Sequence, residues 1–407
     1  MSIAKSAVPD HVPAELVHDF SLFTSPGMKP TACGNPQAAL SHLHTDAPPI
    51  FYAASNTYDG RGTWVFTKAE DQRAILQNAA VFSSNRGLFK SALGEDLPMI
   101  PLEIDPPDHQ KYRSLLNPLL SPKRVDALEA GARERAVRLI EGFVAKGSCE
   151  IMNDFAFPFA VGVFLQFLGV PDDRRDEYLG WANDQFHGTL DQRQAAMRTV
   201  VSFVSDMIAQ RRAAPTDDFI GFLLTAELEG RRLSDKEILG IGVLLFEAGL
   251  DTVAAAIGFD LYHLATHGDD QQRLRDDPDL IKPAVEEMFR AYATIQMLRQ
   301  AATDTEYKGI RIRAGDMVSC PTMVANRDPA EFPDPDRIDI ARETNRHNSF
   351  AYGPHRCLGS HLARRELVIG LEEFLRRIPS FEIKSGTAPT TYGGHVFGIE
   401  NLVLSWG

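Results

Sequence analysis

One long apolar stretch, from residue 234 to residue 267, constrains the fold of this chain more than any other feature. It begins with Ser234-Asp235-Lys236-Glu237, a capping box, and it ends at His267-Gly268, where glycine suits a helix stop. A helix between these signals has roughly nine turns and a length on the order of 50 Å. Because the stretch is largely apolar, we expect a buried helix that crosses the whole molecule.

The middle of this predicted helix is unusual, because Ala248-Gly249-Leu250-Asp251-Thr252 places glycine, aspartate and threonine together. Gly249 costs about 1 kcal/mol relative to alanine. The Thr252 hydroxyl can bond back to the carbonyl of Ala248 and loosen the helix there. A carboxylate at Asp251 is costly to bury unless it is paired. These local penalties indicate a functional groove, and the alternative is a hydrogen-bonded polar kink in a core helix.

Length and composition fit a globular protein with a large core. The chain has 407 residues, of which 44% are hydrophobic. The length alone suggests two or three domains, but no linker or repeat divides the sequence. We therefore expect a single domain over residues 1–407.

Charge and cysteine usage exclude several classes of function. The net charge of −13 disfavours nucleic-acid binding. The four cysteines lack C-x-x-C spacing, which argues against a zinc site or a disulfide framework and favours a reducing compartment. Residues 1–23 contain no apolar run long enough for a signal peptide or a membrane anchor. We expect a cytoplasmic protein without a membrane partner.

A second motif surrounds Cys357, in the segment Phe350-Ala351-Tyr352-Gly353-Pro354-His355-Arg356-Cys357-Leu358-Gly359. Apolar residues at helical spacing follow it, so the cysteine lies at the start of a helix. Backbone N–H groups and the helix dipole there favour a thiolate. Glycines on both sides allow a flat partner to approach, which suggests a haem ligand. The alternative is an inert cysteine buried in a core helix.

The pattern Phe-x-x-Gly-x-x-x-Cys-x-Gly resembles the haem-binding loop of the cytochrome P450 family, with Ala351 in place of the usual glycine. The resemblance covers the chain after about residue 50. It implies a mainly α fold with a small β-rich lobe, haem b as cofactor and Cys357 as the axial iron ligand. Haem contacts are also implied for Phe350, Gly353 and Gly359.

Three other motifs match the same family. His109 and Arg113 lie four residues apart on one predicted helical face, and the resemblance implies that they bind a haem propionate together with Arg299 and His355. Taken alone, such a pair is equally typical of a solvated basic face. Glu287 and Arg290 resemble the Glu-x-x-Arg ion pair of the family, with Arg337 as its third member. Asp251 and Thr252 resemble the acid–alcohol pair that handles protons during oxygen activation.

The sequence is most similar to the camphor-hydroxylating branch of the family, but no tyrosine occurs between Phe82 and Ile104, so we expect a substrate other than camphor. Residues 394–406 suggest a hairpin whose tip, near Val396, enters the pocket. Glu247 either reaches the pocket rim or a basic partner, or faces a helix or water outside the pocket. The candidate pocket residues, mostly apolar, are Phe89, Leu97, Leu244, Glu247, Ala248, Ile295, Val396 and Phe397.

These features predict a monooxygenase that hydroxylates a small apolar substrate, terpenoid or ionone-like, with O2. A non-catalytic haem sensor and a peroxide-driven peroxygenase of the same fold remain alternatives. The chain carries no flavin or iron–sulfur motif, so electrons are expected from a separate acidic iron–sulfur ferredoxin and its reductase. The expected docking cations are Lys111, Arg113, Lys123, Arg124, His355, Arg364 and Arg365.

Overall fold

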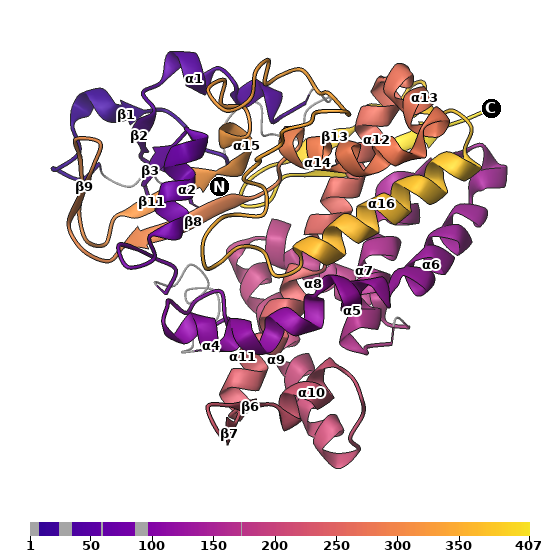
Figure 1. The fold of residues 1–407 in the computed structure, drawn as a ribbon, viewed down its shortest axis with the longest axis horizontal. Coiled ribbons are helices and arrows are strands. Elements are labelled where there is room, and N and C mark those ends of the chain that lie inside the picture. The colour runs from indigo at the N-terminus through magenta and orange to yellow at the C-terminus, as the bar shows by residue number, and fades with distance from the viewer. Residues whose placement is uncertain (1–7, 24–34, 58–59, 86–96, 172) are drawn as a thin grey trace.

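The structure is a computed structural model that describes residues 8–23, 35–57, 60–85, 97–171 and 173–407. Figure 1 shows a sheet-containing lobe on one side, built from N-terminal strands and from strands of the last third of the chain, and a larger helical body on the other. The predicted fold class, mainly α with a small β-rich lobe, is confirmed.

The main sheet has six strands among the described residues, in the order β1-β2-β3-β11-β8-β4. Strands β2 and β3 pair antiparallel with Ile50 opposite Phe66. Both are buried along their whole length, which fits their apolar and β-branched side chains. The strands are β1 (Val17–His18), β2 (Ile50–Ala53), β3 (Thr63–Phe66), β4 (Phe82–Ser83), β8 (Gln296–Ala301) and β11 (Met317–Pro321).

The remaining strands form short ribbons. They are β5 (Ser148–Glu150), β6 (Glu227–Leu228), β7 (Arg231–Arg232), β9 (Thr305–Tyr307), β10 (Ile310–Ile312), β12 (Glu382–Ile383), β13 (Thr390–Tyr392), β14 (Gly398–Asn401) and β15 (Val403–Ser405). The predicted hairpin over residues 394–406 differs from the structure: β14 pairs with β13, whereas β15 pairs with β5 and β12.

Helices make up the rest of the fold (Figure 1). Those before the long apolar stretch are α1 (Leu43–Asp46), α2 (Ala69–Gln77), α4 (Asp108–Leu116), α5 (Pro122–Asp126), α6 (Glu129–Glu141), α7 (Phe157–Leu168), α8 (Arg175–His187), α9 (Leu190–Ala213) and α10 (Phe219–Thr225). Those from that stretch onward are α11 (Asp235–Ala248), α12 (Thr252–Thr266), α13 (Gly268–Asp276), α14 (Ile281–Ala291), α15 (Thr322–Ala325) and α16 (Ser360–Arg377).

The predicted long helix is two helices, α11 and α12, which meet at Gly249–Asp251. The capping box at Ser234 is present and starts α11 as expected. A Cβ atom at position 249 would collide with the ring of Phe164 on α7, so only glycine fits there. The Thr252 hydroxyl donates a hydrogen bond to the carbonyl of Ala248 at 3.3 Å, which is the predicted back-bond.

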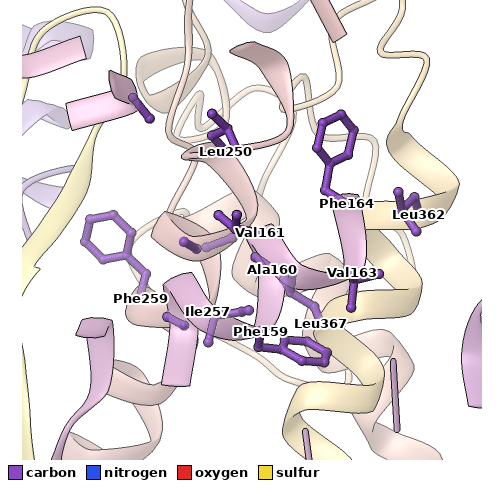
Figure 2. Packing of buried hydrophobic residues seen from close by; sticks show 14 of the residues in the cluster. Phe159, Ala160, Val161, Val163, Phe164, Leu250, Ile257, Phe259, Leu362 and Leu367 are labelled. Atoms are coloured by element: carbon purple, nitrogen blue, oxygen red, sulfur yellow. The ribbon is translucent and has the colours of Figure 1, made fainter. Parts of the chain in front are cut away.

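The core packs α7 between the broken helix and α16. Figure 2 shows side chains from α7, among them Phe159 and Phe164, beside Leu250 and Ile257 on one side and Leu362 on the other. Among the described residues, the stretch Asp235–Thr266 is also long and apolar enough to suit a membrane span, but most of it is buried inside this core. Helix α7, the broken helix and α16 thus share one core.

Candidate functional site

The loop before α16 holds Cys357 by its backbone. The Cys357 N–H donates to the carbonyl of Phe350 at 2.8 Å, and the Arg356 N–H donates to the carbonyl of Gly353 at 3.1 Å. Gly353 has φ +73°, and a side chain there would collide with the backbone of α2 at Leu76. The glycine is therefore needed both for its backbone conformation and for the close approach of the loop to α2.

The sulfur of Cys357 faces a cavity. The side chain has accessible surface even though protein surrounds it, because it lines this cavity at the start of α16. Burial raises the pKa of the thiol, whereas a hydrogen bond from the backbone of Gly359 and the charges of Arg113, Arg356 and Arg364 lower it. The expected thiolate-favouring groups are present, but burial outweighs them and keeps the pKa of the thiol above its usual value.

The cavity lies between the broken helix and α16. Thr252, Ala256 and Asp260 line it from α12, one helical turn apart. Gly359, Leu362 and Glu366 line it from the opposite side, on and just before α16. The structure thus brings two motifs that lie about 100 residues apart in sequence to facing walls of one space.

The four predicted propionate ligands gather near one edge of this cavity. His109 and Arg113 line it from α4, and His355 lines it from the cysteine loop. The rings of His109 and His355 lie 4.2 Å apart between centroids. Arg299 is buried on β8, and its charge acts on both histidines. The predicted grouping agrees with these positions.

Burial leaves this group short of partners. Neither ring nitrogen of His109, nor Nε2 of His355, has a hydrogen-bond partner among the described residues. Burial, together with the charges of nearby cations, lowers the pKa of His109 to about 4 and that of His355 to about 2. Burial also lowers the pKa of Arg299 and Arg113.

This chemistry fits haem b. Buried donors and cations without a carboxylate partner suit two propionates, since charge-assisted bonds would compensate their desolvation. Gly359 leaves the cysteine sulfur open, because a Cβ atom there would meet only the Cys357 Sγ at 4.0 Å. A flat macrocycle would therefore have room against the start of α16, where Cys357 would bind its metal.

Asp251 and Thr252 occupy the helix break. Thr252 lines the cavity. Asp251 is buried, and its Oδ1 accepts a hydrogen bond from the hydroxyl of Tyr392 at 3.0 Å. Burial raises the pKa of Asp251 to about 6, although the bond from Tyr392 opposes that rise. The acid and the alcohol are adjacent, but only the alcohol is among the cavity-lining residues.

The predicted pocket residues divide into two groups. Leu244, Ala248 and Ile295 line the cavity. Leu97, Val396 and Phe397 are buried but are not among its lining residues; Val396 instead forms an isolated β-bridge with Ile295. Phe89 lies outside the described residues.

Glu247 does not line the cavity either. It is 6% exposed on α11, its Oε1 has no hydrogen-bond partner among the described residues, and burial raises its pKa to about 8. No basic partner appears for it in the part of the chain that the structure describes. Glu247 is therefore buried outside the cavity, which leaves only the alternative that it faces a helix outside the pocket.

The predicted ion-pair network is centred on Glu287. Its Oε1 and Oε2 accept from Arg290 at 2.7 and 2.8 Å, and both side chains are fully buried. The third cation is Arg342, whose Nε donates to Glu287 at 2.9 Å. Arg337 differs from the prediction, since its side chain is 71% exposed and only its carbonyl accepts from Arg290. The Arg337 side chain therefore faces solvent, and the next arginine in the sequence, Arg342, reaches Glu287 in its place.

Sequence reasoning missed three residues of the site: Tyr392, Asp260 and Glu366. Asp260 and Glu366 line the cavity and are buried. A signal for both was available, because each is a carboxylate on the apolar side of its helix. Tyr392 carried no such signal, since only the tertiary fold brings β13 to the helix break.

Comparison with known proteins identifies the family. The family model described as "Cytochrome P450" matches residues 176–400. The chain is 55% identical over 405 residues to the "Probable cytochrome P450 127A1" of Sinorhizobium fredii, covering 99% of this chain and 98% of that one.

Two crystal structures are similar along their whole length. That of CYP101J2 has a TM-score of 0.88 and 32% identity, covering 99% of this chain and all of the other. That of CYP101C1 has a TM-score of 0.87 and 33% identity, covering 98% and 100%. With the cysteine loop, the facing helix break and these matches, the chain belongs to the cytochrome P450 family of haem b-dependent monooxygenases.

Proposed function

We propose that this chain hydroxylates a compact apolar substrate, terpenoid or ionone-like, by inserting one oxygen atom of O2 into a C–H bond. The observation that carries the proposal is that Cys357 and Thr252 line one cavity from opposite walls. A metal ligand and a proton-handling alcohol thereby face the same small space. The other oxygen atom leaves as water, so the reaction consumes protons and electrons as well as O2.

We assign iron ligation to Cys357 and propionate binding to His109, Arg113, Arg299 and His355. The thiol loses its proton to bind the metal, and the Gly359 backbone and nearby arginines favour that loss. Haem supplies the oxidative chemistry, and a thiolate ligand favours O–O cleavage. Phe350, Gly353 and Gly359 shape the loop against which the macrocycle lies.

We assign proton delivery to Asp251 and Thr252. The Thr252 hydroxyl donates to the Ala248 carbonyl, so its oxygen lone pairs remain directed at the cavity. With a pKa of about 6, Asp251 exchanges protons readily near neutral pH. The acid thus replenishes protons that the alcohol positions for reaction.

The lining of the cavity near the helix break supports the proposed substrate class. Leu244, Ala248, Val253 and Ile295 are apolar and line the same cavity as Thr252. Such walls bind a substrate by burying its apolar surface. They fix its orientation only weakly, because orientation depends on polar contacts. A compact hydrocarbon skeleton suits this lining better than a charged molecule does.

We propose that electrons come from an acidic ferredoxin. Several of the predicted docking cations, however, already pair with carboxylates of this chain or lie at the cavity. Lys111 pairs with Asp108 and Glu229, Arg364 with Glu286, and Arg365 with Asp126 and Glu129. Arg113 and His355 lie at the cavity.

Exposed cations near the cysteine loop remain for a partner. Lys123 and Arg124 on α5 and Arg356 beside Cys357 are exposed, and none of the three has an ion pair among the described residues. Helix α5 packs against α16. This small basic surface, Lys123, Arg124 and Arg356, supports docking of an acidic partner close to the cysteine loop.

Two alternatives are separable by experiment. A haem sensor would bind ligands without substrate-dependent consumption of reduced nicotinamide in the presence of a ferredoxin system. A peroxygenase of this fold typically carries Arg-Pro in place of the acid–alcohol pair, so Asp251-Thr252 disfavours it. A substrate panel scored by the spin-state shift of the iron, followed by product analysis, tests the proposal. Cys357→His should lose the spectrum of a thiolate–carbonyl complex, and retention of that spectrum would remove the ligand assignment.

A further inference from the structure

Arg364 on α16 lies over the ring of Phe350, in the loop that holds Cys357. Its guanidinium carbon is 4.3 Å from the centre of that ring, which is well within the range of a cation–π contact. Phe350 lines the cavity, and its carbonyl accepts the hydrogen bond from the Cys357 N–H. A positive charge therefore rests on a residue that contacts both the cavity and the backbone of the cysteine.

Glu286 on α14 holds the guanidinium in this position. Its Oε1 accepts from Nε of Arg364, and its Oε2 accepts from Nη2 at 2.9 Å, so the contact is bidentate. Burial raises the pKa of Glu286, but the hydrogen bonds from His347 and Arg364 outweigh it and lower the pKa to about 2. Glu286 is therefore a charged carboxylate at neutral pH.

His347 fixes Glu286 from the other side. The Ser349 N–H donates to Nδ1 of His347 at 3.2 Å, so this nitrogen carries no hydrogen. Nε2 then carries the hydrogen of the neutral ring and donates it to Glu286 at 3.1 Å. Burial lowers the pKa of His347, which agrees with a neutral ring. His347 thus anchors the carboxylate without adding a second positive charge.

The ion pair of Arg364 and Glu286 is oriented relative to the cysteine. The charge of Arg364 is among those that lower the pKa of the Cys357 thiol, whereas the charge of Glu286 is not. Arg364 also contacts a ring in the cavity wall, and Glu286 is not among the lining residues. The pair therefore presents its positive end to the cysteine loop and its negative end to α14.

We propose that Arg364 is a positioning residue that sets the reduction potential of the haem iron, because its charge, held over Phe350 by Glu286 and His347, favours the reduced iron. The step is the addition of one electron to ferric iron to give ferrous iron. No proton moves in it, and no covalent bond of the protein forms or breaks. The reduced state carries one more negative charge, so a nearby cation stabilises it. The inference rests on the proposed function only for the ligation of iron by Cys357.

This role differs from the docking role that the sequence predicted for Arg364. A docking cation acts when the partner is bound, whereas a reduction potential belongs to this chain and its haem alone. The side chains of Arg364 and Glu286 are 27% and 32% exposed, so water screens part of the charge of each. We therefore expect an effect of severalfold on the equilibrium constant for reduction.

Spectroelectrochemical titration of the substrate-free holoenzyme with small redox mediators measures this constant without ferredoxin. Arg364→Gln should shift it severalfold toward ferric iron, and Arg364→Lys, which keeps the charge, should recover most of the wild-type value. Glu286→Gln should shift it in the opposite direction, because it removes the negative end and keeps an oxygen that accepts from the guanidinium. Opposite shifts from the two halves of one ion pair identify the charge as the cause, since loss of packing alone has no reason to reverse its sign.

Arg365→Gln is the matched control. Arg365 is the next residue on α16, its side chain is 35% exposed, and it pairs with Asp126 and Glu129. It is not among the cations that lower the pKa of Cys357. Its substitution should leave the potential at the wild-type value. All variants should keep the spectrum of the thiolate–carbonyl complex, which shows that haem and its ligand are in place.

An unchanged potential in Arg364→Gln would overturn the inference, as would shifts of the same sign in Arg364→Gln and Glu286→Gln. If Arg364→Gln does not retain haem, the sign of the shift in Glu286→Gln decides the inference. Absence of the thiolate–carbonyl spectrum in the wild type would count against the proposed function. A normal wild-type spectrum with no shift in Arg364→Gln would count against this inference alone.

Discussion

The hydroxyl of Tyr392 donates a hydrogen bond to Oδ1 of Asp251 at 3.0 Å and thereby ties β13 to the helix break. Asp251 belongs to the junction of α11 and α12, whereas Tyr392 is 141 residues further along the chain. The bond stabilises the charged form of a buried acid and opposes the effect of burial on its pKa.

Removing this bond should move the titration of Asp251. We expect Tyr392→Phe to raise the pKa of Asp251 above its value of about 6, because burial remains and the donor is lost. The limb of the pH–rate profile that belongs to Asp251 should move to higher pH in Tyr392→Phe and be absent in Asp251→Asn. A profile unchanged in both variants would show that Asp251 does not titrate during turnover.

Thr252→Ala should separate oxygen consumption from product formation. Substrate should still bind, since one hydroxyl is lost from an apolar wall, but reducing equivalents should be released as peroxide. Asp251→Asn should instead slow the whole cycle, because its proton supply acts earlier. Product, peroxide and nicotinamide consumption measured together distinguish the two results. Unchanged coupling and rate in both variants would assign the helix break another role.

Glu247 should make stability depend on pH. Its pKa is raised from 4.5 to about 8, so the folded state holds a proton that the unfolded chain releases between these values. Stability therefore falls as pH rises from about 4.5 to about 8, by an amount on the order of a few kcal/mol. Glu247→Gln should flatten that decline in denaturant titrations.

Glu134→Gln, an exposed change on α6, is the control for Glu247→Gln and should leave the decline in place. Because Glu247 does not line the cavity, Glu247→Val should leave substrate affinities nearly unchanged. A large change in affinity would mean that substrate reaches α11 at this turn.

Glu287→Gln should be strongly destabilising. It leaves the fully buried Arg290 without its carboxylate, and breaking a buried pair in this way costs about 3–5 kcal/mol. The free energy of unfolding from denaturant titration measures this loss. Arg174 and Glu177 form a matched control, because they are also three residues apart, at the start of α8, and are about half exposed. Glu177→Gln should change stability little, and equal losses at the two sites would contradict the buried network.

Charge reversal at Arg124 should slow ferredoxin-driven turnover and raise its Michaelis constant for ferredoxin. The wild-type rate should fall as salt rises, because salt screens charge pairs between the two proteins. Peroxide-driven turnover should remain near wild type, since haem binding is not disturbed. Arg311→Glu is the control: Arg311 is exposed on β10, whose partner strand β9 lies across the molecule from α5 (Figure 1). Equal losses with both electron sources would indicate that Arg124 supports the fold.

The sequence predicted those parts of the structure that local chemistry determines. The capping box at Ser234 lies where the pattern placed it, because it depends on a few neighbouring residues. The back-bond of Thr252 to Ala248 was likewise available from spacing alone. The pattern of one motif around Cys357 was specific enough to indicate the family.

Contacts between distant segments were not predictable in the same way. The break at Gly249 depends on the Phe164 ring, which comes from a helix 85 positions earlier in the chain. Whether Arg337 or Arg342 reaches Glu287 depends on how the segment after Phe332 folds. The sequence pattern alone allows either arginine. Strand β15 pairs with β5 and not with the adjacent β14, because the packing of the whole fold determines which strands pair.

The contact between Phe164 and Gly249 has a consequence for how relatives of this chain can diverge. A side chain at position 249 can be accommodated only if the residue at position 164 becomes smaller, because the ring occupies the place of the missing Cβ atom. The two positions should therefore change together across related sequences. A lineage that replaces the glycine without shortening its partner would displace the turn that carries Thr252, so drift at two residues in the wall of the cavity is restrained by a single steric contact.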